Sequence, residues 1–178
     1  SKLNFYFAAI CFSIGLYDVA CIGLYNSLSV ASGIFWQKCQ YFTIQLVAAS
    51  FFYFTYYLVG RKKDGRLAAY CVMMAVMFAL GVFFNDKIFS LNDPIVRQVS
   101  GFFFQMTYYE ARPGLLMNLL YAFLFVGMAY VFSLLIYFLI RDRRTDLWPL
   151  IIGFCTFFVS AVLDILIGAE LISIIYTA

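Results

Sequence analysis

The stretch from Leu115 to Ile140 contains 26 consecutive residues without a single charged side chain. A helix needs roughly 20 mostly apolar residues to cross the hydrocarbon core of a bilayer, which is about 30 Å thick. Backbone groups inside that core find no water, so only helices and closed β-barrels can cross it. A barrel strand would alternate apolar and polar residues. This stretch does not alternate, and it therefore predicts a membrane-spanning helix.

The composition of the whole chain extends this prediction. Of its 178 residues, 65% are hydrophobic and 12% are charged, whereas a soluble domain carries about 45–50% apolar and about 25% charged residues. We therefore expect an all-α integral membrane protein that forms one domain over residues 1–178. Five apolar segments indicate the spans: residues 4–25, 35–59, 67–84, 113–140 and 148–167.

Cationic residues gather at alternate ends of these segments. Eight of the twelve Lys and Arg residues lie at Lys2, in the loop 61–66 or in the loop 141–144. Short cytoplasmic loops are enriched in Lys and Arg. This distribution predicts a cytoplasmic N-terminus, with both basic loops on the cytoplasmic side. Because the chain begins with Ser1 and ends in an apolar run, we also expect helices to be missing at one or both ends.

The longest connection, residues 85–112, lies on the predicted outer side. It combines a turn signal, Asn92-Asp93-Pro94, with an aromatic block at Phe102–Phe104 and Tyr108-Tyr109. Aromatic rings exposed on a mobile loop would leave a large apolar surface in water. We therefore expect an ordered outer cap, built from two short strands or from an interfacial segment.

Two carboxylates fall inside predicted spans, Asp18 and Asp164. Ionisable residues are costly in a bilayer and usually face the interior of the helix bundle. Asp18 shares a helix face with Cys11, Gly15 and Ile22, and small residues of this kind permit close helix packing. A second face carries Asp164 together with Gly153, Ser160 and Gly168.

Three further polar residues belong to the same candidate ligand-binding set. Asn118 lies at a comparable depth, and Lys38 and Arg112 stand at the outer ends of their predicted helices. One interpretation is an outward-facing polar cavity with cations at its rim. The other is a set of interhelical hydrogen bonds in which Asp18 forms a salt bridge with Lys38.

Several classes of chemistry lack their usual residues. The chain has no histidine, which excludes His-ligated haem and removes the commonest ligand of zinc and copper. The five cysteines are scattered and form no CxxC pair. Neither a phosphate-binding loop nor an HExxH motif occurs. We expect no catalytic residue, metal or cofactor and no nucleic-acid partner, while contacts with lipids or carotenoids remain open.

Four groups of residues resemble the pattern of a known family. The residues on which the resemblance rests are Phe35-Trp36-Gln37-Lys38-x-Gln40, then Phe51-x-x-Phe54 followed by Gly60, then Pro113-Gly114, and finally Arg141-Asp142-Arg143-Arg144 before residues 150–164. Their order resembles the seven-transmembrane sensor modules at the N-terminus of bacterial sensor histidine kinases and diguanylate cyclases. The chain departs from that pattern because only five spans are visible and no kinase or cyclase segment follows.

The resemblance implies a signal-sensing domain in the bacterial cytoplasmic membrane. Such a domain would couple an outer or in-membrane stimulus to a cytoplasmic output domain that this chain does not include. Two alternatives stay open: a non-catalytic accessory subunit of a larger energy-transducing membrane complex, and a small-solute transport component. The expected partners are membrane lipids and other transmembrane helices, in a homodimer or a larger complex.

The charge distribution yields a direct test of orientation. In a cysteine-free background, Lys63→Cys and Arg143→Cys should both be shielded from an impermeant thiol reagent in intact cells and react after permeabilisation. Reaction of either cysteine in intact cells would contradict the predicted orientation.

Overall fold

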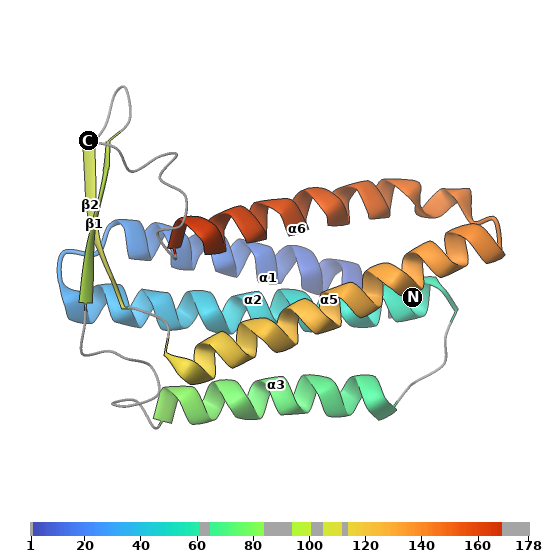
Figure 1. Ribbon diagram of the computed structural model, residues 1–178, viewed down its shortest axis with the longest axis horizontal. Helices are drawn as coiled ribbons and strands as arrows, with labels where there is room; N and C mark the ends of the chain where they lie inside the picture. The colour runs from blue at the N-terminus through green and yellow to red at the C-terminus, as the bar shows by residue number, and fades with distance from the viewer. Residues whose placement is uncertain (1, 61–64, 84–93, 101–104, 112–113, 169–178) are drawn as a thin grey trace. The chain divides into compact units, whose positions relative to one another are not determined.

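The computed structural model describes residues 2–60, 65–83, 94–100, 105–111 and 114–168, and it is mostly helical (Figure 1). Five α-helices and one short β-hairpin occur within these residues. The helices are α1 (Lys2–Tyr25), α2 (Val30–Leu58), α3 (Gly65–Phe83), α5 (Leu115–Arg141) and α6 (Trp148–Gly168). The strands are β1 (Pro94–Ser100) and β2 (Gln105–Ala111), and a 3-10 turn, η1, covers Thr145–Leu147.

Each of the five predicted apolar segments corresponds to a helix. Two of the helices, α1 and α5, are long and apolar enough to cross a membrane, by length and composition alone. The largest boundary error concerns α2, which begins at Val30 and not at residue 35. The side chain of Ser29 caps this end by accepting a hydrogen bond from Ser32 N at 3.2 Å.

Contacts divide the chain into two units, which are described separately. In the first unit, α1 and α2 form an antiparallel pair (Figure 1). The ring of Tyr6 stacks on those of Tyr53 and Tyr57, with centroids 5.4 and 5.2 Å apart. Near the other end, Gly23 lies directly against the indole of Trp36, so that even a Cβ atom would not fit. The two helices are therefore joined along their whole length.

The first half of α5 packs with α2 and α3 in the same unit. Met74 of α3 meets Met117 and Leu120 of α5 in a buried apolar cluster. Tyr70 of α3 donates a hydrogen bond to the carbonyl of Phe123. This close approach depends on Gly127, because an added Cβ there would collide with the Tyr70 hydroxyl.

Two parts of the segment predicted to form a cap, residues 94–100 and 105–111, lie within the described residues. Strands β1 and β2 pair into a two-stranded sheet, which is one of the two arrangements expected from the sequence. The described residues are therefore mostly helical, as expected, with one short two-stranded sheet in addition. The residues Phe102–Phe104 and most of the turn signal lie outside the described residues.

The second unit contains the end of α5, η1 and α6. Leu135 and Leu147 are fully buried, and the ring of Phe154 stacks on Phe132 at a centroid distance of 5.4 Å. In the connection between the helices, Arg144 Nη2 forms an ion pair with Asp146 Oδ2 at 2.6 Å. This pairing holds the pKa of the exposed Asp146 carboxyl below its usual value.

Candidate functional site

Three of the five candidate site residues have side chains in the part of the chain that the structure describes. Asp18 is exposed on α1, Asn118 is exposed on α5, and Lys38 is half-buried on α2. Within the described part of the chain, Asp18 and Lys38 form no ion pair, so the predicted salt bridge is absent there. Arg112 and the side chain of Asp164 lie outside the described residues.

The expectation that Asp18 faces the interior is wrong for the chain by itself. Helix α1 buries the stripe Ser13, Ala20 and Leu24, and Asp18 lies off that stripe. Cys11, Gly15, Asp18 and Ile22 do share one face, as the helical spacing predicts, but all four are exposed. The buried stripe faces the rest of the chain, and the face that carries Asp18 is left uncovered.

A different group of residues is both polar and buried, at the junction between the hairpin and α2. The side chain of Gln37 is 7% exposed. Its Oε1 accepts a hydrogen bond from Ala111 N at 2.8 Å, and its Nε2 donates to Ala111 O at 2.9 Å. One amide thus satisfies both backbone groups at the end of β2, as a neighbouring strand would do.

The same strand is held at two more places, two and three residues before Ala111. Tyr109 N donates to the hydroxyl of Ser27 at 3.3 Å, and its carbonyl lies so close to Gly33 that a Cβ atom there would clash. Tyr108 is 3% exposed and meets Tyr25 edge to face, with ring centroids 5.1 Å apart. We call Gln37, Ser27, Gly33 and the residues 108–111 that they contact the cap junction.

Polar contacts continue from the cap junction along α2. Gln37 Nε2 also donates to the hydroxyl of Tyr41 at 3.0 Å. The ring of Tyr41 meets that of Tyr121 of α5 edge to face, with centroids 5.9 Å apart. Both rings pack against the apolar cluster of Met74, Met117 and Leu120. The cap is therefore connected through one glutamine and two tyrosines to the centre of the first unit.

An ion pair lies inside the hairpin beside this junction. Arg97 Nε of β1 is 3.3 Å from Glu110 Oε2 of β2, and the two side chains are 9% and 22% exposed. Burial raises the pKa of Glu110 above its ordinary value of 4.5, and the Arg97 charge opposes that rise only in part. The Glu110 carboxyl therefore takes up a proton at a higher pH than an exposed, paired glutamate would.

Chemically, this arrangement suits a conformational role. The junction offers hydrogen bonds whose breakage would release the hairpin, and a carboxyl whose charge depends on pH. Within the described residues, no group of His, Cys, Asp and Glu could hold a metal ion. The described geometry therefore places reversible hydrogen bonds and a titratable carboxyl side by side where the hairpin meets α2.

Sequence reasoning missed the cap junction although it quoted Gln37. Four of the five candidate residues carry a charge, whereas the amide of Gln37 does not. One signal was available. Gln37 lies in an apolar run that is expected to form a helix, in which the backbone groups bond one another. A buried side-chain amide in that helix therefore needs a partner from another segment. Which backbone group would meet it depends on the fold of the distant cap.

Comparisons with known proteins add no functional assignment. The chain matches no protein-family model, no curated protein and no solved structure. The resemblance to sensor modules therefore stays a proposal.

The contribution of Gln37 can be measured with a matched pair of variants. Gln37→Leu should leave the N–H and the carbonyl of Ala111 buried without a partner, at a cost of about 1–3 kcal/mol for each group. Hydrogen exchange should then speed up at β2 while α3 keeps its protection. Gln40→Leu is the control, because Gln40 bonds Tyr17 and Cys21 of α1 and not the cap. Equal exchange at β2 in both variants would contradict the assignment.

The Glu110 carboxyl predicts a pH dependence of defined sign. Because its pKa is raised in the folded protein, its ionisation disfavours the folded state. Thermal stability should carry no penalty from this group below pH 4.5, and the penalty should grow as the pH rises through the raised pKa. Glu110→Gln should abolish this component, whereas Asp142→Asn, which removes an exposed acid, should retain it. A Glu110→Gln curve parallel to wild type throughout would refute the prediction.

Proposed function

We propose that this chain is a membrane-embedded sensing domain. An outer or in-membrane stimulus acts on the cap junction or on the helices below it, and the response travels along α2 towards the end that carries the basic loop. The output would be made by a cytoplasmic domain outside this chain. In this proposal the N-terminus is cytoplasmic and the protein resides in the bacterial cytoplasmic membrane.

The observation that carries the proposal is the pairing of Gln37 with Ala111. It joins an outer hairpin to one continuous helix of 29 residues. The far end of that helix contacts α1, since Tyr53 and Tyr57 stack on Tyr6, so a shift of α2 would change this ring packing. A regular helix transmits a tilt or a shift at one end to the other, since its backbone hydrogen bonds hold it as a stiff rod.

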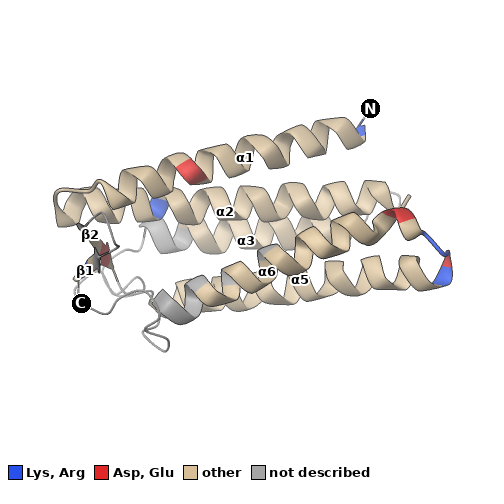
Figure 2. Cartoon of the chain, turned by 90° about the horizontal axis from the view of Figure 1, so that it is seen from above, with Lys and Arg blue, Asp and Glu red and all other residues tan. Residues whose placement is uncertain are grey.

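The surface of the helices supports the membrane location. Large apolar side chains such as Phe12, Leu115 and Ile140 are 69%, 74% and 72% exposed. Most turns of the helices carry no charged residue (Figure 2). In water such a surface would be an aggregation hazard, whereas in a bilayer it contacts lipid tails.

A second candidate function rests on Asp18. This carboxylate is exposed within an otherwise apolar stretch of α1, and an exposed charge in hydrocarbon needs a polar partner. Another helix that covers this face would supply one, as in an accessory subunit of a larger membrane complex. Purification with other subunits at a fixed stoichiometry would favour this candidate over the sensor.

The sensing proposal is tested by following both ends of α2 at once. The full chain is placed in nanodiscs with 3-fluorotyrosine at Tyr57 or at Tyr108, and external pH serves as the perturbation of the cap. We expect a pH change that shifts the fluorine resonance of Tyr108 to shift that of Tyr57 as well. In Gln37→Leu the Tyr108 response should persist and the Tyr57 response should be lost.

Two results would overturn the proposal. In the first, Tyr108 responds and Tyr57 of the wild-type chain does not, so that no signal reaches the far end. In the second, Gln37→Leu and the control Gln40→Leu transmit the response equally well. Tyr130, which belongs to α5, serves as a fluorine reference outside the α1–α2 pair.

A further inference from the structure

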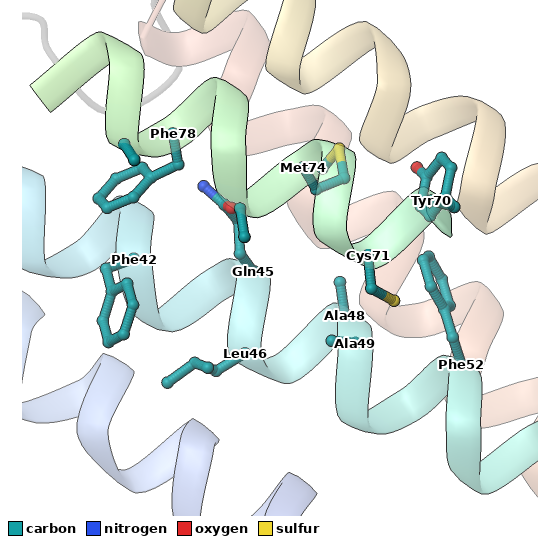
Figure 3. Close-up of a pocket in the computed structure, with 12 residues that line it drawn as sticks. Phe42, Gln45, Leu46, Ala48, Ala49, Phe52, Tyr70, Cys71, Met74 and Phe78 are labelled. Carbon is teal, nitrogen blue, oxygen red and sulfur yellow. The ribbon is translucent and has the colours of Figure 1, made fainter. Parts of the chain in front are cut away.

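A cavity of about 350 Å³ lies between α2 and α3, away from the cap junction. Its walls are apolar and partly aromatic, with Phe42 and Phe52 from α2 and Tyr70 and Phe78 from α3 (Figure 3). Sites for small ligands typically span about 300–1,000 Å³ and combine an apolar lining with a few polar groups. The cavity is therefore large enough for one ring-sized molecule.

Small side chains create this space. Ala48 and Ala49 of α2 face Ala75 and Ala79 of α3 across it. The spacing of Ala75 and Ala79 on a helix is of the kind that usually lets two helices pack closely. Here the small residues border a cavity, which gives them a role other than helix contact.

One polar group in the lining lacks a partner. The Nε2 atom of Gln45 is fully covered and has no hydrogen-bond partner within the described residues. Figure 3 shows the side chain extending from α2 towards α3 among the aromatic rings. An unsatisfied amide N–H in an apolar site costs about 1–3 kcal/mol, and a ligand that brings an acceptor oxygen removes that cost.

The depth of Gln45 narrows the chemistry of the ligand. Gln45 is near the middle of α2, roughly 20 Å along the axis from either end. The ester carbonyls of glycerolipids lie at the boundary of the hydrocarbon core, about 15 Å from its centre. They cannot reach this amide without a large displacement. A neutral ring that carries a carbonyl and dissolves in the hydrocarbon can.

We infer that the cavity binds a lipophilic carbonyl compound of the quinone class, with one ring carbonyl accepting a hydrogen bond from Gln45 Nε2 once the amide rotates to present that covered atom to the cavity. The ring lies among Phe42, Phe52 and Phe78, and the side chain of the ligand extends into the lipid. The inference rests on the membrane location that the proposed function assigns. The inference identifies the chemical class of an in-membrane stimulus for that function. The contacts at the cap junction do not identify one.

The test uses the full chain in lipid-free detergent micelles, with native mass spectrometry to count bound molecules. The probes are a benzoquinone with a ten-carbon chain and decylbenzene, which has a similar shape and no carbonyl. Wild type should bind one quinone per chain. Gln45→Leu should weaken quinone binding about two- to tenfold, as expected for one hydrogen bond, and should leave decylbenzene binding unchanged.

A second variant tests the same cavity independently, in case Gln45→Leu fails to fold. Ala75→Leu fills the cavity from a position where the side chain is exposed, and it should abolish binding of both probes. The matched controls are Gln40→Leu on α2 and Ala68→Leu on α3, neither of which lines the cavity. Both controls should bind quinone as wild type does.

Three results would overturn the inference: no quinone binding by wild type, quinone binding that Gln45→Leu and Ala75→Leu both leave unchanged, or a co-purified glycerolipid that quinone does not displace. Binding is counted directly, without reference to signalling. If the wild-type chain binds quinone but Tyr57 does not respond, the sensing proposal alone is rejected. If Tyr57 responds but the wild-type chain binds no quinone, this inference alone is rejected.

Discussion

The position of the hairpin against α2 depends on a single amide, that of Gln37, which hydrogen-bonds both backbone groups of Ala111. Buried backbone N–H and C=O groups are almost always paired, because leaving one unpaired costs more than a formed hydrogen bond contributes. β2 ends at Ala111, and among the described strands it pairs with β1 alone, which leaves its other edge without a strand partner. The glutamine supplies that missing partner, and in doing so it fixes where the hairpin meets α2.

Other contacts become possible once this position is fixed. Tyr109 reaches Ser27 and passes over Gly33, and Tyr108 is buried against Tyr25. The ion pair between Arg97 and Glu110 contributes less to stability, since burial of the carboxyl offsets much of the attraction. Its more distinctive property is that it makes the stability of the cap depend on pH. The junction thus combines hydrogen bonds that hold the hairpin with a titratable neighbour, and the proposed sensing role makes use of both.

The sequence predicts the helices well and the contacts between them poorly. Long apolar runs determine where helices form, so five segments were placed within a few residues, and the aromatic content of 85–112 indicated an ordered cap. The error at α2 arose because Val30–Ile34 includes Ser32 and Gly33, which interrupt the apolar run although Ser29 caps a helix there. The orientation of Asp18 and the partner of Gln37 depend on which stripe of each helix is buried. That choice is made by side-chain packing between distant segments, which periodicity alone does not encode.

The most direct test of the central claim is the distance between the cap and the turn that joins α1 to α2. Nitroxide labels at Leu28 and Thr107, both exposed, would report it by pulsed electron resonance in nanodiscs. If Gln37 holds the hairpin to α2, wild type should give one narrow distance distribution, and Gln37→Leu should broaden it while Gln40→Leu does not. A broad distribution in the wild-type chain, or one that Gln37→Leu leaves unchanged, would contradict the account.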